Sequence, residues 1–298
     1  KKEFLKLVNG SLASSDMSLT VALLAIELDD NVLAEKYFNQ SLERGHSQPG
    51  QIYIYLSRIY EIRNDYDAAM SWVNKVSSGP NFLEAKILGA QFTAKHQTVD
   101  KALTLLDSYN SIDINEKLII LKTKASLLLS NDRGEDAYEL MKNEDNNFKD
   151  SAEFKFDYAV LSEKMGNTLL MEQLLTEAIK LKPDYAVAYN ALGYSYADRN
   201  INLDVAKRNI EIALSIQPKN HYILDSMGWV YYRLGNNKIA LEFLRKAYAA
   251  QEDPEIAAHL GEVLWKMKEK EKASKIWQSS LRNNPNNKVL LDTIDKFR

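Results

Sequence analysis

The chain has 298 residues, a formal net charge of −3 and no cysteine. A charge so close to zero argues against general attraction to nucleic acid or a membrane surface, and the missing cysteines exclude disulfides, thiolate metal sites and a cysteine nucleophile. The longest purely apolar run, Val21 to Ile26, is too short to span a bilayer. The chain begins at Lys1 and not at Met, so we expect a processed or trimmed protein from which any targeting signal or lipid anchor has been removed.

The pattern of apolar residues predicts an all-helical fold. Glycine and proline are scarce, and apolar side chains recur at positions i, i+3, i+4 and i+7 over most of the chain. No stretch of useful length alternates between apolar and polar residues as a strand would. The fold class predicted from these observations is all-α.

An alanine, replaced by Met171 in one unit, recurs along the chain with a nearly fixed period. In chain order, its positions are Ala34, Ala69, Ala102, Ala137, Met171, Ala206, Ala240 and Ala273. Successive members of this series lie 33 to 35 residues apart. The sequence therefore predicts an array of eight similar units, each built from two helices.

The units keep this pattern to different degrees. Units one to four, residues 15–151, diverge from it, whereas units five to eight, residues 152–287, follow it closely from residue 186 onward. There, Gly193, Gly228 and Gly261 would let the first helix of a unit approach the second, and Gly166 and Gly235 would end first helices in a left-handed conformation. We expect residues 1–14 to form an N-terminal helix or linker and residues 288–298 a helix that caps the last unit.

This pattern resembles the tetratricopeptide repeat over residues 15–287. The resemblance implies an α-solenoid, a right-handed superhelix of antiparallel helix pairs. It also implies that the first helices of successive units line a concave groove, a surface on which such proteins commonly bind peptide segments.

The stretch Asp225 to Asn236 concentrates one Trp and two Tyr in four residues. Asp225, Trp229 and Tyr232 share one helical face with Arg233, whereas Tyr231 lies on the packing face. Adding the equivalent positions of the neighbouring units predicts a peptide-binding set: Asn190, Tyr194, Asp198, Tyr222, Asp225, Trp229, Tyr232, Arg233, Glu262, Trp265 and Lys266. We expect the aromatic residues Tyr194, Trp229, Tyr232 and Trp265 to face one solvent-filled groove, because aromatic and Arg side chains dominate binding hot spots. In the alternative interpretation, an individual ring fills the seam between neighbouring first helices.

No catalytic constellation is visible in the sequence. The four histidines lack metal-ligand spacing, and neither a phosphate-binding glycine loop nor a G-x-S-x-G elbow occurs. We therefore expect a non-enzymatic protein with no cofactor and no metal. His259, Trp72 and Trp277 are interpreted as structural residues of the core.

The C-terminal third carries a narrower resemblance. The segments ALGYSYADRN, ILDSMGWVYYRLGN and DPEIAAHLGEVLWKM are similar to LbcA-like tetratricopeptide-repeat lipoproteins of Gram-negative bacteria. That similarity implies a periplasmic adaptor, anchored to the outer membrane through a lipid that this chain lacks and otherwise soluble. Its implied partners are proteins, a carboxyl-terminal-processing protease and peptidoglycan hydrolases, and not nucleic acid.

Three alternatives remain open at this point. One is an assembly factor, such as a pilotin-like protein for an envelope or pilus machine. Another is an enzyme whose catalytic domain lies outside these residues, and the third is a eukaryotic chaperone co-factor, whose carboxylate clamp has no counterpart here. We also predict that the divergent residues 83–150 are the least stable part of the array, since each unit is stabilised mainly by its neighbours.

Overall fold

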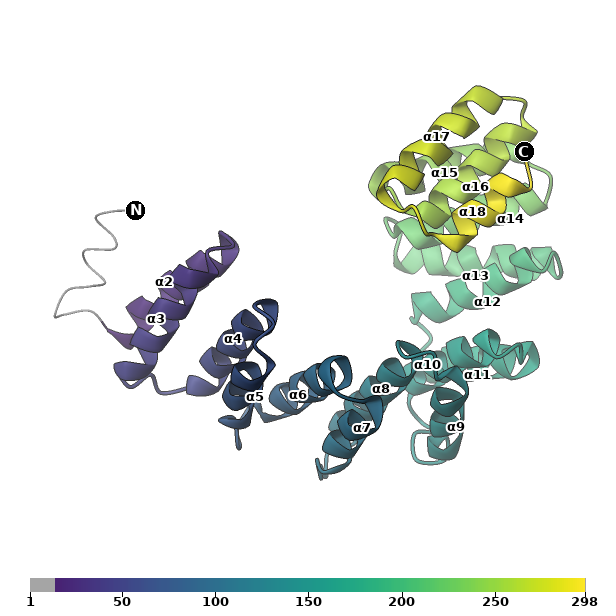
Figure 1. The fold of residues 1–298 in the computed structure, drawn as a ribbon. Helices are drawn as coiled ribbons and strands as arrows, with labels where there is room; N and C mark the ends of the chain where they lie inside the picture. Colours follow the sequence, from purple (N-terminus) through teal and green to yellow (C-terminus); the bar gives the residue numbers. More distant parts are fainter. Residues whose placement is uncertain (1–13, 298) are drawn as a thin grey trace. The chain divides into compact units, whose positions relative to one another are not determined.

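The computed structural model describes residues 14–297, which form seventeen helices and no strand (Figure 1). The all-α prediction is confirmed over this range. The predicted N-terminal helix or linker falls almost wholly on residues 1–13, outside the described residues, as does Arg298 at the end of the predicted cap.

The helices fall into two compact units that divide between Met141 and Lys142, within α9. The helices of the first unit are α2 (Ser15–Glu27), α3 (Asn31–Glu43), α4 (Pro49–Ile62), α5 (Tyr66–Asn74), α6 (Phe82–His96), α7 (Val99–Asp107), α8 (Ile114–Leu129) and most of α9 (Gly134–Glu144). In this unit α2 packs on α3, α4 on α5 and α6 on α7, each as a pair of sequence neighbours.

The second unit continues with the same pairing. Its helices are α10 (Ala152–Lys164), α11 (Thr168–Leu181), α12 (Ala186–Asp198), α13 (Leu203–Ile216), α14 (His221–Arg233), α15 (Asn237–Ala250), α16 (Pro254–Lys266), α17 (Lys270–Asn283) and α18 (Lys288–Asp295). Each first helix of this unit packs on its second helix, and the first helices α12, α14 and α16 also contact one another in sequence. These three first helices therefore form a continuous layer.

Local chemistry explains where the helices begin and end. Side chains of Asp, Asn, Ser and Thr cap many of them; Asn220, for example, accepts hydrogen bonds from the backbone N–H groups of Tyr222 and Ile223 at the start of α14. The turn inside most helix pairs contains a residue with positive φ. Gly166 and Gly235 supply it as predicted, at φ 75° and 80°, and Asn200 supplies it at φ 56° in the pair between them.

The periodic residues, seven alanines and Met171, lie where the two helices of a pair meet. All eight, from Ala34 to Ala273, are buried, with at most 1% of each residue exposed. A Cβ added to Gly193 would lie 2.6 Å from Cγ1 of Ile210 and 2.8 Å from the carbonyl oxygen of Ala206. Only glycine therefore permits this approach, and the predicted reason for the glycine positions is confirmed.

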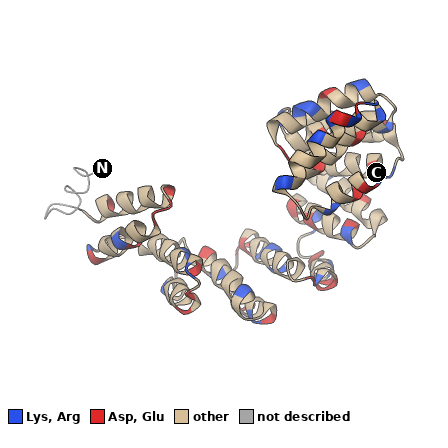
Figure 2. Ribbon diagram, turned by 45° about the horizontal axis from the view of Figure 1, so that its top comes forward, with Lys and Arg blue, Asp and Glu red and all other residues tan. Residues whose placement is uncertain are grey.

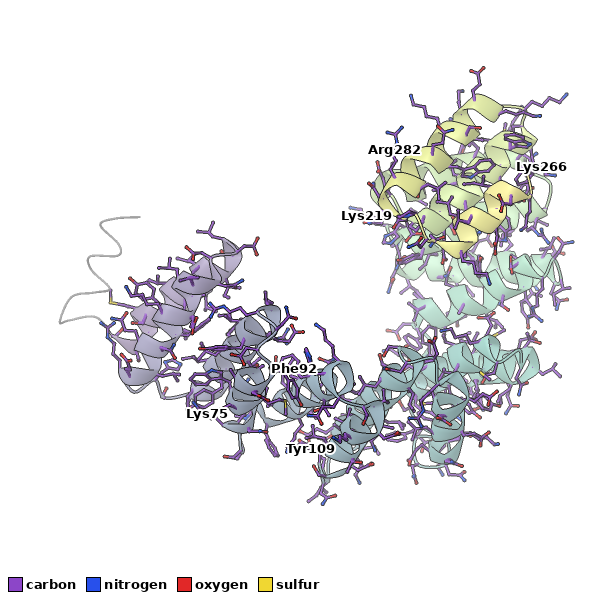
Figure 3. The ribbon with its side chains drawn as sticks, viewed as in Figure 1. Lys75, Phe92, Tyr109, Lys219, Lys266 and Arg282 are labelled. Atoms are coloured by element: carbon purple, nitrogen blue, oxygen red, sulfur yellow. The ribbon has the colours of Figure 1, made fainter. Side chains whose placement is uncertain are left out.

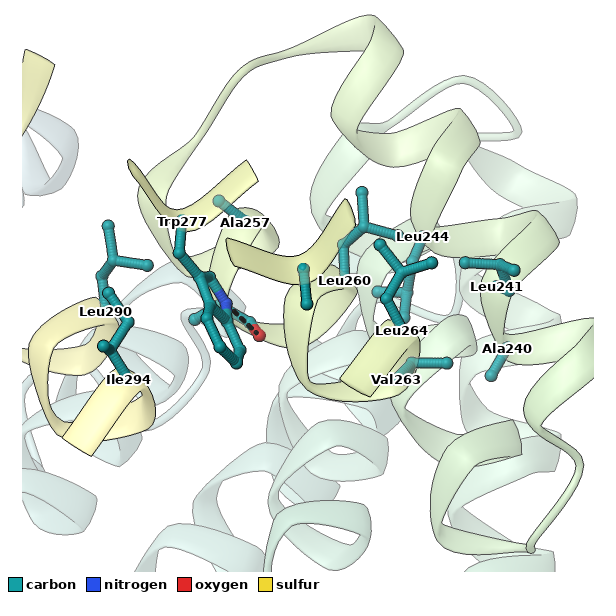
Figure 4. Packing of buried hydrophobic residues seen from close by; sticks show 12 residues of the cluster. Ala240, Leu241, Leu244, Ala257, Leu260, Val263, Leu264, Trp277, Leu290 and Ile294 are labelled. Carbon is teal, nitrogen blue, oxygen red and sulfur yellow. Dashed lines mark hydrogen bonds between the residues drawn. The ribbon is translucent and has the colours of Figure 1, made fainter. Parts of the chain in front are cut away.

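The C-terminal end is closed by α18. Leu290 and Ile294 of this helix are buried in a cluster with Trp277, whose indole N–H donates a hydrogen bond to the carbonyl oxygen of Ala258 (Figure 4). The prediction that Trp277 belongs to the core is confirmed. Trp72, predicted the same way, is only half-buried, and Nζ of Lys75 lies 3.4 Å from its ring centroid.

Between residues 14 and 297, no helix is both long enough and apolar enough to cross a membrane.

Candidate functional site

The predicted binding residues lie on three neighbouring first helices, α12, α14 and α16. We call the side of these helices that carries the predicted residues the inner face. Because α12 contacts α14 and α14 contacts α16, residues about 34 positions apart in sequence become neighbours in space. The inner face is therefore assembled by the repeat itself.

At its centre, Asp225 and Trp229 of α14 pack against His259 of α16. The two carboxylate oxygens of Asp225 lie 2.9 and 3.0 Å from Nδ1 of His259. Since an ionised carboxylate only accepts hydrogen bonds, Nδ1 carries the proton and donates it. The Trp229 ring stacks on the imidazole with centroids 4.2 Å apart and planes 22° apart.

The expectation that Trp229 faces a solvent-filled groove is wrong. Trp229 is 6% exposed and Asp225 is 7% exposed, so both fill the seam between α14 and α16. The alternative interpretation, in which a ring fills an inter-repeat seam, is correct for Trp229. The reason is the imidazole of His259, which offers a flat partner for the indole and a donor for the carboxylate.

The electrostatics favour a charged His259. Burial acts to lower the pKa of His259, but the attraction and hydrogen bond of Asp225, with smaller contributions from Glu262 and Asp198, outweigh burial and raise it. The structural interpretation of His259 is thus supported, and the residue holds α14 against α16 through a buried ion pair.

Tyr194 of α12 lies beside this pair. Its ring centroid is 6.1 Å from that of His259, and its side chain is only partly buried. Burial raises the pKa of Tyr194 well above its ordinary value. The carboxylates of Asp198, Asp225, Glu255 and Glu163 raise it further. The hydroxyl therefore stays protonated and can donate a hydrogen bond within a negatively charged surrounding.

Tyr232 and Arg233 extend the inner face at the end of α14. The Tyr232 hydroxyl donates a 2.9 Å hydrogen bond to Oε1 of Glu262, and burial together with Glu262 raises the pKa of Tyr232. The Arg233 guanidinium lies 5.7 Å from the Trp229 ring centroid and donates to the carbonyl oxygen of Asp198 at 3.3 Å. These contacts connect α12, α14 and α16.

Trp265 belongs to the C-terminal cluster more than to the inner face. It stacks on Trp277 with ring centroids 5.8 Å apart and contacts Phe297 at the same distance. It is half-buried, and Nζ of Lys270 lies 4.7 Å from its ring centroid. The expectation of four aromatic rings in one groove is therefore wrong for Trp265 as well as for Trp229.

The remaining predicted residues lie nearer to solvent. Tyr222, Asp198 and Lys266 are exposed (Figure 3 labels Lys266), and Asn190 is half-buried. Three polar atoms near the inner face are buried without a hydrogen-bond partner within residues 14–297: Oδ1 of Asn190, Nε1 of Trp229 and Nε of Arg233. Unpaired buried polar atoms are uncommon and mark places where a water or a ligand can supply the missing bond.

His259 and Glu255 are not among the predicted peptide-binding residues. The sequence does distinguish His259. The equivalent positions of the two preceding units hold the small residues Ala191 and Ser226, so a histidine departs from the pattern there. Burial raises the pKa of Glu255 too, with Asp253 and Asp225 adding to the rise and His259 opposing it. Both residues belong to the charged centre of the inner face.

The inner face offers recognition chemistry. It combines hydroxyl, carboxylate, imidazole and guanidinium groups that already pair with one another across helices. No group of three or more His, Asp or Glu side chains within the described part of the chain could hold a metal ion.

Comparison with known proteins identifies the repeat. The family model of the tetratricopeptide repeat matches residues 222–254, which cover α15 and all of α14 except its first residue. The TPR repeat-containing protein PA4667 of Pseudomonas aeruginosa is 33% identical over 207 residues, which cover 70% of this chain and 35% of that protein. The chain thus spans about a third of the length of this curated relative.

Solved structures agree on the fold. The thermophilic TPR protein TTC0263 of Thermus thermophilus has a TM-score of 0.51 at 21% identity, over 58% of this chain and 93% of that one. A tetratricopeptide repeat protein of Parabacteroides merdae has a TM-score of 0.55 at 14% identity, over 94% and 97%. Together these findings support a tetratricopeptide-repeat protein whose fold is the predicted all-α solenoid.

Proposed function

We propose that this tetratricopeptide-repeat chain is a non-enzymatic adaptor that binds a segment of a partner protein on the inner face of α12, α14 and α16. Tetratricopeptide-repeat proteins generally serve as scaffolds for protein interactions. The observation that carries the site is the Tyr194 hydroxyl, a protonated donor on a partly buried ring beside the buried Asp225–His259 pair. The unpaired atoms of Asn190 and Arg233 add further hydrogen-bonding capacity nearby.

We further propose that the adaptor works in the periplasm, anchored to the outer membrane in the native protein. Its partners would be a carboxyl-terminal-processing protease and the peptidoglycan hydrolases that this protease cleaves. The proposal is supported by the resemblance of residues 186–285 to LbcA-like lipoproteins, and the absence of cysteine is compatible with an oxidising compartment.

The test is capture of partners from an envelope extract of Gram-negative cells, followed by mass spectrometry. One bait is the wild-type chain. The second bait is Asp198→Lys/Tyr222→Ala/Lys266→Glu, three substitutions at exposed inner-face positions that leave the buried seam intact. The matched control is Lys219→Glu/Glu242→Lys, which reverses two exposed charges away from the inner face.

We expect a processing protease or wall hydrolase to be retained by the wild type and the control and to be lost from the inner-face variant. Retention by all three baits would remove the inner face from the proposal. Capture of a secretin or pilus component in place of a protease would support the assembly-factor alternative and contradict the protease adaptor.

A second assay tests the adaptor activity directly. Purified protease should cleave its hydrolase faster when the wild-type chain is added, and the inner-face variant should not accelerate cleavage. A rate that does not change with the wild-type chain, although both proteins bind it, would refute the adaptor mechanism.

A further inference from the structure

The last two units enclose a hollow on the side of the second helices. It lies between α15 and α17, above α16, and has a volume of about 330 Å³. Its floor and walls are mainly apolar, formed by Leu260, Leu264, Tyr248 and Ile276. Figure 4 shows Leu260 and Leu264 on α16 beside Leu244 of α15. We call this space the outer hollow.

The seam at the outer hollow differs from the preceding seam in two residues. In the preceding seam, between α13 and α15, Tyr231 and Phe243 stack with centroids 5.8 Å apart and planes 10° apart. The repeat places Leu264 and Ile276 at the equivalent positions of the last unit. Two aliphatic side chains fill somewhat less space than an aromatic pair, so the last seam lacks the stacked rings that the seam before it contains.

The rim of the outer hollow is basic, unlike the rim of the preceding seam. Arg245 and Lys275 occupy the positions that Glu211 and Glu242 hold one unit earlier. Both cations are exposed, and no carboxylate within residues 14–297 forms an ion pair with either of them. Lys272, also on the rim, pairs with Glu269.

The two helices that border the hollow share this charge. α15 and α17 together carry seven Lys and Arg residues and two Glu residues, and this blue colouring near the C-terminus can be followed in Figure 2. Glu252 is the single acidic side chain in the lining. The chain thus combines an apolar hollow with unpaired positive charge on its edge.

We propose that the outer hollow docks an acidic protein segment that inserts one large apolar side chain, Phe, Trp or Leu. The inserted side chain lies against Tyr248 and Ile276, the partly exposed apolar residues of the lining, and flanking Asp or Glu residues pair with Arg245 and Lys275. Charge complementarity of this kind steers association and fixes orientation. A concave site with an apolar lining fits an inserted side chain better than a flat anionic membrane.

This second surface is separate from the inner face and does not depend on the adaptor function. The test is methyl NMR of the whole chain, observing Leu260, Leu264 and Ile276 during titration with a capped peptide that carries one Phe between Asp and Glu residues. We expect saturable shifts of these methyl signals that shrink as salt is added. Peptides with Ala in place of Phe, or Lys in place of the acids, should shift them little.

Two variants locate the site. Arg245→Glu/Lys275→Glu installs the charges of the preceding seam and should weaken peptide binding about tenfold, or about 1.4 kcal/mol. Lys238→Glu/Arg282→Glu changes the net charge equally at exposed positions outside the lining and should bind as the wild type does. Ile276→Phe, at a partly buried position of the lining, should fill part of the hollow and weaken binding.

Three results would overturn the proposal. The first is that the acidic Phe peptide shifts none of the three methyl groups at millimolar concentration. The second is that the Lys peptide binds equally well. The third is that phosphatidylglycerol vesicles, and not the peptide, bind in a manner that depends on Arg245 and Lys275, which would assign the basic rim to a membrane surface.

Discussion

The buried pair of Asp225 and His259 leads to a prediction that combines stability with pH. In the variant Asp225→Asn, the side-chain oxygen can still accept a hydrogen bond from Nδ1 of His259, so the geometry of the seam is kept. The charge is lost, and burial then dominates the environment of the imidazole. We expect the pKa of His259 to fall from its raised value toward or below that of a free histidine.

The loss of stability in Asp225→Asn follows from the weakened hydrogen bond between residues 225 and 259. A hydrogen bond to a charged group contributes roughly 1.5–3 kcal/mol and a neutral one roughly 0.5–1.5 kcal/mol, so the variant should lose about 1 kcal/mol at acidic pH. Because the folded pKa of His259 is raised above its unfolded value of about 6.5, the stabilisation is complete below about pH 6.5. It is lost as pH rises through the folded pKa, and the two proteins should converge above it.

Two measurements test this reasoning. NMR titration of the imidazole signals gives the pKa of His259 directly, with His259→Gln used for assignment. Urea unfolding, followed by tryptophan fluorescence between pH 5.5 and 9, gives the stability difference. A His259 pKa at or below about 6.5 in the wild type, or a stability difference that grows with pH, would refute the charged pair.

Three further predictions concern the array. Gly228→Ala should lower the free energy of unfolding by about 1–2 kcal/mol in urea titrations. The new Cβ would lie 2.6 Å from Cγ of Leu244, and this overpacking outweighs the gain in helix propensity. Unchanged stability would contradict the close approach of the two helices. Leu290→Ala should lower the free energy of unfolding by about 2–4 kcal/mol and shift the emission maximum of Trp277 to longer wavelength. The reason is that Leu290 is fully buried in one cluster with Trp277. An unchanged emission maximum would show that α18 does not cover this ring. Amide hydrogen exchange should be faster across residues 83–150 than across 186–285, and uniform protection would reject the divergent segment as the weakest part.

Much of the fold follows from the sequence because each unit is determined locally. The series that includes Ala206, Ala240 and Ala273 is buried as expected, and Gly166 and Gly235 take the predicted left-handed conformation. These residues meet steric requirements that recur in most units, so the sequence shows them as a period.

The candidate site was predictable only in part. Helical spacing correctly placed Asp225, Trp229 and Tyr232 on one side of α14. It does not show how deeply each side chain is buried, and Trp229 is buried. Depth depends on what the next unit contributes at the seam, and here that is His259. The spacing likewise could not show that Trp265 turns toward the C-terminal cluster with Phe297.

The sequence by itself determined the helices, their pairing and their period, because 3.6-residue periodicity, capping residues and small contact positions act within a single unit. Only the tertiary structure decided which side chains remain reachable by a partner. Asp225 and His259 are 34 residues apart in sequence and 2.9 Å apart in space, and the outer hollow is lined by side chains from three different helices. Such contacts arise between units, where the depth of each side chain is set by its neighbour across the seam.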